Sequence, residues 1–373
     1  AVWTEIINRD DEAQKLAVEN SKGAFEYFVK RGLATRRTKV LPATIRINGK
    51  DVPFADMRFT SVDAGFEKLP DSGNRTYADI ADIMIVGFRD YLEQNDGISA
   101  NAQANVMARL TNILYTLSER AKLDKASELV RDAIDEGKQV AVFTATKSET
   151  RFDRFRYTEK YAEQHGLDRR ENVFSASKVL EIMDTFSEKQ SVSEQFGLNV
   201  KDIPPFSHVT VAMATIVDKY KFLEDLVIPS AVEYLQERFE DDGVSVYIGG
   251  KSANDLAEAK EKWSNNENKV FIATMAKGGT GLSLHDKIGN RENGTVQIQL
   301  QLPWVASEVD QVSGRVARYG MKSPVQIEWL FAKAGNMPME ENLAWRVAAR
   351  LQNQGAALKD LSIEDMSAIS ELQ

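Results

Sequence analysis

The chain has 373 residues, 43% of them hydrophobic, which is enough for two or three domains with packed cores. Its net charge of −9 has the wrong sign for a small basic module that coats nucleic acid, although a local basic track remains compatible with it. The absence of cysteine excludes disulfides and thiolate metal sites, and the three histidines (His165, His208 and His285) lack metal-ligand spacing, so we predict no metal site.

The sequence shows no feature that would place the protein in or across a membrane. No apolar run approaches the ~20 residues that a membrane-spanning helix needs. The first residues show no signal-peptide pattern. We therefore expect an intracellular protein without a membrane partner, in the cytoplasm or nucleoid if its source is a bacterium or phage.

The first third of the chain reads as helical and accessory material. Residues 1–40 are expected to form a helical segment. Residues 41–120 combine short β-like runs, such as 44–47 with the two-residue turn that follows, with a helix over about 77–93. We interpret 41–120 as a linker or accessory region.

A helix, a buried strand and an insertion are predicted next. Apolar residues recur at three- and four-residue spacing from 101 to 136, which predicts helix up to Gly137, and the apolar run 139–144 predicts a buried strand. Residues 147–227 read as a mostly helical insertion that opens with a basic-aromatic cluster at 151–157. These basic and aromatic side chains could contact phosphates and stack on bases, or they could form an amphipathic helix with buried rings and solvated arginines.

A strand at 244–248 leads into Gly249-Gly250-Lys251-Ser252, which mimics the end of a phosphate-binding P-loop. The full pattern GxxxxGK[ST] would need glycine where Ser245 stands, so we predict a turn before a helix at 253–263 instead. No other segment offers that pattern. A phosphate-cradling loop is therefore not expected in this chain.

Two further predicted strands, 270–274 and 296–302, each lead into a polar, glycine-bearing segment, 277–282 and 311–320. In an open α/β sheet such segments lie at the carboxyl ends of the strands, where ligands bind. In the second segment the spacing of Arg315 and Arg318 predicts a shared helical face, with Gly314 leaving room for close backbone approach. Two such guanidiniums suit a phosphate group, although an exposed basic helix face explains a lone pair as well.

These two segments carry a family resemblance. The pattern Gln311-x-x-Gly314-Arg315-x-x-Arg318 resembles motif VI of superfamily-two helicases and translocases, and 274–282 resembles motif V. The stretch "GGTGL … QVSGRVARYGMKSPVQIEWL" is similar to Swi/Snf-type translocases, and 283–286 with 302–304 resembles strawberry-notch-type helicases. The resemblance is specific from about 244 to 331.

The resemblance implies a RecA-like α/β fold, that is, a parallel sheet with helices on both faces, here with a helical insertion and an N-terminal helical or linker segment. It places the second RecA-like lobe of a helicase at 121–345, with the insertion at about 147–227 and a C-terminal helical tail at 346–373. Residues 1–40 would then be the tail of a missing first lobe or a separate helical segment.

The resemblance also implies roles for individual residues. Arg315, Arg318 and Gln311 would be catalytic, and Gly279, Thr280, Gly281 and Gly314 would bind the cofactor. Candidate nucleic-acid contacts are Thr274, Lys277, Thr144, Arg151, Arg154 and Arg156.

In such a motor, ATP with Mg²⁺ lies between two lobes, and an arginine finger raises the rate of phosphoryl transfer by roughly 10³–10⁵. We therefore expect the C-terminal half of an ATP-dependent helicase or translocase, inactive alone. Its partners would be DNA or RNA and a first lobe, in the same longer polypeptide or in a partner chain. The alternative is a non-catalytic nucleic-acid-binding or assembly protein on a helicase-lobe scaffold.

Overall fold

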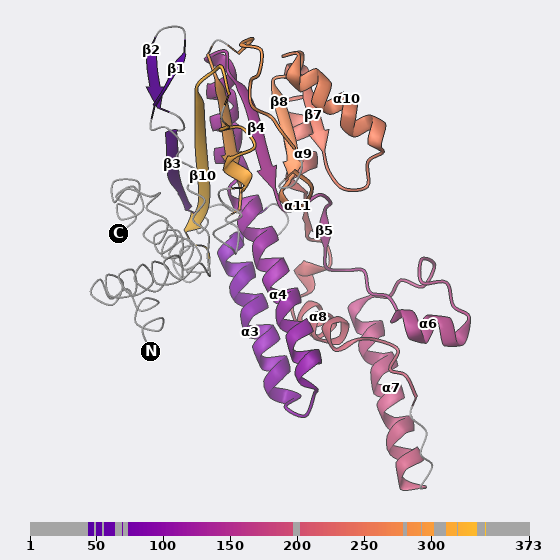
Figure 1. Ribbon diagram of the computed structural model, residues 1–373. Helices are drawn as coiled ribbons and strands as arrows, with labels where there is room; N and C mark the ends of the chain where they lie inside the picture. Colours follow the sequence, from indigo (N-terminus) through magenta and orange to yellow (C-terminus); the bar gives the residue numbers. More distant parts are fainter. Residues whose placement is uncertain are drawn as a thin grey trace, which may run out of the picture.

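The structure, a computed structural model, describes residues 44–47, 50–53, 56–63, 69, 74–196, 202–278, 282–291, 293–301, 311–318, 320–333 and 340. Three sets of predictions lie outside these residues. They are the segment 1–40, the glycine turn with Gly279, Thr280 and Gly281, and the C-terminal tail 346–373. Figure 1 shows the arrangement of the described elements.

The centre of the molecule is a six-stranded, all-parallel sheet with the strand order β3-β10-β9-β4-β8-β7 (Figure 1). Its central strands are buried along their whole length, as expected for parallel strands that are covered on both faces. The strands are β3 (Asp56–Asp63), β4 (Gln139–Thr144), β7 (Val244–Tyr247), β8 (Val270–Thr274), β9 (Thr295–Gln299) and β10 (Val325–Lys333).

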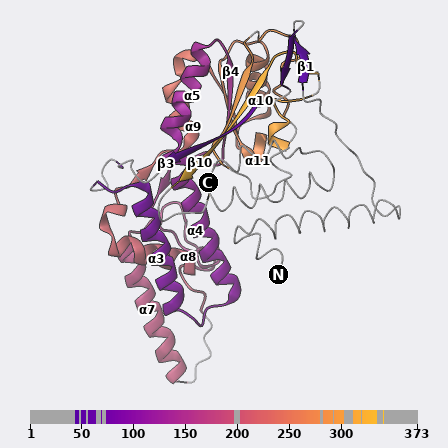
Figure 2. The same ribbon diagram turned by 90° about the vertical axis from the view of Figure 1, so that its left-hand side faces the viewer.

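Helices cover both faces of this sheet, which confirms the predicted fold class. Side chains alternate along β4, so that Val140 and Val142 join one core and Ala141 and Phe143 join the other. The first core packs against α5 (Leu123–Asp135) and α9 (Ala231–Arg238). The second contains Trp263 of α10 (Ala253–Ser264) and residues of 282–284 and 312–317. Figure 2 shows α5 and α9 together on one side of the sheet.

Strand β3 corrects the interpretation of 41–120 as a linker or accessory region, because it is the edge strand of the central sheet. It pairs in parallel with β10, from Asp56 opposite Gln326 to Asp63 opposite Lys333. The sequence hid this strand because an edge strand needs no continuous apolar run, and Arg58 is exposed in it. The hairpin expected near 44–47 is present as β1 (Thr44–Ile47) and β2 (Lys50–Pro53).

The remaining helices form an arm that extends away from the sheet (Figures 1 and 2). Helices α3 (Tyr77–Gln94) and α4 (Ala100–Ala121) pack with α8 (His208–Lys219), and α7 (Ala176–Gln195) packs with α8. A hydrophobic core of its own fills this arm, including Ile80, Met84, Phe88, Leu110, Ile113, Leu114, Leu117, Val179, Met213 and Val217. The predicted insertion is mostly helical, but it folds together with α3 and α4 as one unit.

Short elements complete the described chain. They are β5 (Thr150–Arg151), α6 (Glu159–His165), the 3₁₀ helices η1 (Lys221–Leu223) and η2 (Glu240–Asp242), β6 (Val227–Ile228) and α11 (Met275–Gly278). Strands β5 and β6 pair antiparallel near the two ends of the segment 147–227 that was predicted as an insertion. Among the described residues, none of the helices combines the length and apolarity needed to cross a membrane.

Candidate functional site

The carboxyl ends of β4 and β8 lie side by side, since Thr144 pairs with Thr274 in the parallel register. Segments that follow such strands meet at one edge of the sheet, where ligands bind in open α/β folds. Helix α11 follows β8 directly and carries Lys277, whose side chain is exposed. The predicted motif V segment therefore starts at this edge.

Thr144 and Thr274 are themselves turned away from solvent, which argues against their predicted nucleic-acid contacts. Thr144 is fully buried, and its hydroxyl donates to the carbonyl of Thr146 at 3.1 Å. Thr274 is also buried. Both residues end central strands that are covered on both faces, and their side chains remain inside the fold in this conformation.

In the segment 311–318, which carries the motif VI pattern, residues 311–313 are α-helical and residues 314–316 form a turn. The Arg315 amide donates to the Val312 carbonyl at 3.0 Å, and the Ala317 amide donates to the Ser313 carbonyl at 3.1 Å. Val312 and Val316 are buried in the core beneath the segment. The predicted shared helical face of the two arginines is therefore only partly formed.

Arg315 holds this segment to the loop that follows the glycine turn. Its Nη1 donates to the Leu282 carbonyl at 3.1 Å, and its own carbonyl accepts from the Leu284 amide at 2.8 Å. The side chain is half-buried. The segment with the motif VI pattern is thus directly bonded to residues 282 and 284, at the end of the segment that resembles motif V.

Arg318 and Gln311 are exposed on the same short segment, with the half-buried Gly314 between them. Burial, and then the neighbouring positive charge of Arg318, lowers the pKa of Arg315. Two guanidiniums close enough to repel one another favour an anion between or beside them. Two of the residues predicted to be catalytic, Arg315 and Arg318, are therefore close to one another, and a pair of guanidiniums suits a phosphate group.

Strand β9 places three glutamines on the face below this segment, a feature that the sequence interpretation missed. Gln297 donates from Nε2 to the Val312 carbonyl at 3.3 Å, and Gln301, just beyond the strand, donates from Nε2 to the Tyr115 carbonyl at 3.0 Å. Between them Gln299 is fully buried, with no hydrogen-bond partner for its amide in the described part of the chain. The signal was visible as glutamines at alternate positions of an apolar run.

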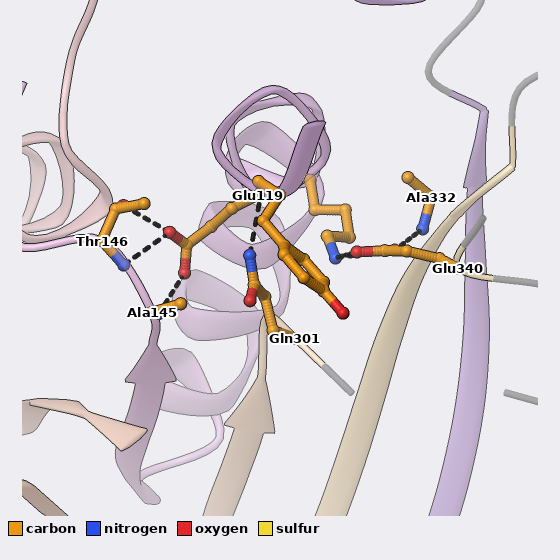
Figure 3. Close-up of polar contacts among 8 residues, drawn as sticks. Glu119, Ala145, Thr146, Gln301, Ala332 and Glu340 are labelled. Atoms are coloured by element: carbon orange, nitrogen blue, oxygen red, sulfur yellow. Dashed lines mark hydrogen bonds and ion pairs between the residues drawn. The ribbon is translucent and has the colours of Figure 1, made fainter. Parts of the chain in front are cut away.

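The end of α4 is bonded to the same edge of the sheet through Glu119 (Figure 3). Its buried carboxylate accepts from the amides of Ala145 at 2.6 Å and Thr146 at 2.9 Å, and from the Thr146 hydroxyl. The Thr146 hydroxyl oxygen in turn accepts from the Ala231 amide at the start of α9 at 3.4 Å. Glu119 therefore joins the helical arm to the loop after β4.

A second buried contact at the root of α4 is the ion pair between Lys122 and Glu340 (Figure 3). The Lys122 ammonium lies 2.7 and 2.8 Å from the two Glu340 oxygens, and both side chains are buried. Glu340 also accepts a hydrogen bond from the Ala332 amide of β10. The end of α4 is thus bonded to the segments that follow β4, β9 and β10.

Replacing Glu119 by glutamine is expected to remove a pH dependence of stability. Burial raises the pKa of Glu119 above 4.5, and it outweighs the donors of Thr146 and Ala145 and the charge of Lys122. An acid with a raised folded-state pKa binds its proton more tightly when folded, so stability falls as pH rises from 4.5 through the folded pKa and is flat above it.

Urea unfolding of the wild type and Glu119→Gln across this pH range measures the effect. The difference in unfolding free energy, wild type minus variant, should decrease as pH rises. The exposed Glu128→Gln on α5 is the control, with the pH dependence of the wild type. A pH-independent difference between wild type and Glu119→Gln would contradict the raised pKa.

In the basic-aromatic cluster at 151–157, the phenylalanine side chains and the arginine side chains lie in different environments. Phe152 and Phe155 are buried in the core of the arm, whereas Arg154 and Arg156 are exposed. Arg151 donates from Nε to Glu149 at 2.6 Å. The cluster is not a helix, since Phe155 forms an isolated β-bridge with Phe174. The two phenylalanine rings are therefore unavailable for stacking on bases, while Arg154 and Arg156 are still free to meet phosphates.

The Walker-like segment is a turn and a helix cap, as expected. Gly250 has a φ of +94°, which favours glycine, and the Ser252 side chain accepts from the Asp255 amide in a capping box of α10. The hydroxyl is therefore occupied with its own helix. Within the described ranges no cluster of His, Cys, Asp or Glu side chains could hold a metal ion.

The known proteins to which this chain is similar include a putative helicase and SWI2/SNF2 ATPases. No family model matches the chain. A putative ATP-dependent RNA helicase, L364, of Acanthamoeba polyphaga mimivirus is 31% identical over 108 residues, which are 29% of this chain and 19% of the relative. The chain therefore spans about a fifth of the length of that protein.

Solved structures that resemble this chain include SWI2/SNF2 ATPases of low sequence identity. The SWI2/SNF2 ATPase core of Sulfolobus solfataricus in complex with double-stranded DNA has 13% identity and a TM-score of 0.41, over 86% of this chain and 50% of that one. The C-terminal domain of the Sulfolobus enzyme has 11% identity and a TM-score of 0.39, over 84% of this chain and 97% of that one.

Proposed function

We propose that this chain is the second, C-terminal lobe of an ATP-dependent nucleic-acid helicase or translocase. The observation that carries the proposal is the direct attachment of motif VI to the end of motif V, through Arg315 and Leu282 at 3.1 Å. The exposed Arg318 stands beside this attachment, at the face of the sheet domain that also carries Gln311. The α/β fold alone would not imply this function.

In this proposal ATP lies between this lobe and a first lobe that supplies the phosphate-cradling loop and the Mg²⁺ ligands. On the side of this lobe, the residues present suit an anion such as the triphosphate, because Arg315 and Arg318 bring two positive charges together. Arg318 would stabilise the charge that develops on the transferring phosphoryl group, and Gln311 would border the same nucleotide. MgATP is the phosphoryl donor in this reaction.

The bond between Arg315 and Leu282 gives a physical route from nucleotide to nucleic acid. A guanidinium that moves toward a phosphate changes its bond to the loop that continues from the glycine turn. That loop borders the edge where Lys277 is exposed. DNA or RNA is the proposed partner, with Lys277, Arg154 and Arg156 as phosphate contacts.

ATP hydrolysis by the isolated chain and by the chain joined to a first lobe tests the proposal. We expect negligible release of phosphate from the chain alone, with or without DNA or RNA, because no P-loop stands in its sequence. Addition of a first lobe, fused or as a separate chain, should produce nucleic-acid-stimulated turnover. A malachite-green assay measures both.

Two outcomes would contradict the proposal. Robust turnover by the isolated chain would require a nucleotide site elsewhere in it. Absence of turnover with a competent first lobe, together with unchanged nucleic-acid binding, would favour the alternative of a non-catalytic binding or assembly protein on the same scaffold.

A further inference from the structure

A turn at 285–291 lies directly beside the segment that carries the two arginines. The Leu284 amide donates to the Arg315 carbonyl at 2.8 Å, and the Lys322 amide donates to the Asp286 carbonyl at 2.9 Å. Two backbone bonds thus fix the turn to the stretch 315–322. Side chains from both stretches share one surface.

This surface is strongly positive in a chain that is negative as a whole. Residues 282–291 and 311–322 contain five Lys and Arg residues and a single acid, Asp286, whereas the whole chain has a net charge of −9. Asp286 is buried, and its carboxylate accepts from the amides of Ile288 at 3.1 Å and Gly289 at 2.8 Å. The acid therefore shapes the turn and does not pair with the cations outside it.

Two of the five cations point inward and three outward. Arg291 is buried, with Nη1 donating to the Leu284 carbonyl at 2.7 Å, and Arg315 is bonded to Leu282. The outward cations are Lys287, Arg318 and Lys322, whose side chains are exposed. None of the three makes a side-chain hydrogen bond or ion pair with any residue that the structure describes. Some lysines on helices are paired, for example Lys125 with Glu128 and Lys178 with Glu181.

The outward cations lie close to one another around the turn. Burial, and then the charges of Lys287 and Arg318, lowers the pKa of His285, which places both cations near that ring. The Lys322 side chain runs past Gly289, where a Cβ atom would lie 3.7 Å from its Cβ and Cδ atoms. We call His285, Lys287 and Lys322 the turn patch, and Arg318, which borders it, keeps the nucleotide role proposed above.

We propose that the turn patch binds the phosphate backbone of a nucleic-acid strand, as a contact separate from the edge of the sheet. This inference rests on the proposed function and adds a second phosphate-binding surface to it. Neighbouring cations without acidic partners repel one another, and a row of phosphates removes that repulsion and releases condensed counterions. Contacts to phosphates carry no sequence information, so we expect this contact to be independent of sequence.

The test replaces the two lysines of the turn patch, neither of which has a catalytic role in the proposed function. Lys287→Ala/Lys322→Ala and the wild type are titrated against fluorescein-labelled DNA and RNA, single-stranded and duplex, over a series of KCl concentrations. Each lost phosphate contact lowers the slope of log affinity against log salt by about one unit, so the double variant should lose about two units and bind more weakly at every salt concentration.

A charge-matched variant separates the patch from net charge. Lys125→Ala/Lys178→Ala removes the same two charges from helices and should keep the wild-type slope, with circular dichroism verifying the fold of all three proteins. Equal slopes for the wild type and the turn-patch variant would overturn the proposal for the turn patch, and so would equal losses of slope in the turn-patch variant and the control variant. Either result would leave the proposed function intact. A loss of affinity for a fluorescent ATP analogue in place of nucleic acid would also overturn it. Failure of the wild type to bind any nucleic acid would overturn the patch and the nucleic-acid part of the proposed function together.

Discussion

Replacing Arg318 by alanine is expected to lower the turnover number of the complete, two-lobe ATPase by about 10³-fold or more. Arg318 is exposed and makes no side-chain bond within the described part of the chain, so its guanidinium is available to a phosphate presented by another lobe. An interaction made chiefly in the transition state lowers kcat and leaves KM for ATP little changed. Steady-state kinetics with saturating DNA or RNA measure both constants.

Two further variants distinguish a catalytic guanidinium from a general loss of charge. Arg318→Lys should recover only part of the rate, because an ammonium is a point charge without the planar fork of the guanidinium. Lys125→Ala, which removes an exposed cation paired with Glu128, should leave kcat unchanged. Retention of turnover within about tenfold by Arg318→Ala would contradict an arginine-finger role.

Arg315 should behave differently from Arg318 in the same assay. Its guanidinium already holds the Leu282 carbonyl at 3.1 Å, so its removal also releases the loop after the glycine turn. We expect Arg315→Ala to reduce both basal turnover and the stimulation of turnover by nucleic acid. The two arginines are equivalent in the motif, and only the structure separates their roles.

The sheet was predictable because its central strands are buried on both faces. Continuous apolar runs such as those at β4 and β8 are typical of strands covered on both faces, and both strands lie where expected. The edge strand β3 escaped prediction because it has no continuous apolar run: its few apolar residues are separated by polar ones such as Arg58. Its partner β10 also lies about 270 residues further on. Pairing over such a separation leaves no local signal.

The polar contacts around the site escaped prediction for a similar reason. Nothing in the helical periodicity of 101–136 marks Lys122 and Glu119 as buried, and their partners lie elsewhere in the chain, at Glu340 and Thr146. The cap at Ser252 was predictable because its partner is three residues away. A hydrogen bond between residues that are close in the chain can therefore be predicted from the sequence. The burial of a charged side chain cannot, because it depends on how distant segments pack.

Replacing Lys122 by methionine is expected to reduce the free energy of unfolding by about 3–5 kcal/mol, the effect of leaving a buried charge unpaired. Glu340 would keep one hydrogen bond, from the Ala332 amide, but would lose both contacts to the ammonium at 2.7 and 2.8 Å. Urea unfolding followed by circular dichroism measures the change in midpoint and slope. Lys125→Met, at a solvent-accessible lysine three residues further along the chain, should change stability little, since exposed ion pairs contribute about 0–1 kcal/mol.

The double variant Lys122→Met/Glu340→Gln separates the buried charge from the loss of packing. Glutamine keeps an oxygen that can accept from the Ala332 amide, so no backbone donor is orphaned and no net charge stays buried. Because a neutral replacement of a buried pair is often close to neutral in stability, the double variant should recover more than half of the loss. Equal instability of the single and double variants would mean that the lysine stem, rather than its charge, holds the root of α4 to the sheet. Recovery would instead show that the loss comes from the carboxylate left unpaired at this root, which joins the helical arm to the edge carrying the candidate site, and that the ion pair itself adds little net stability.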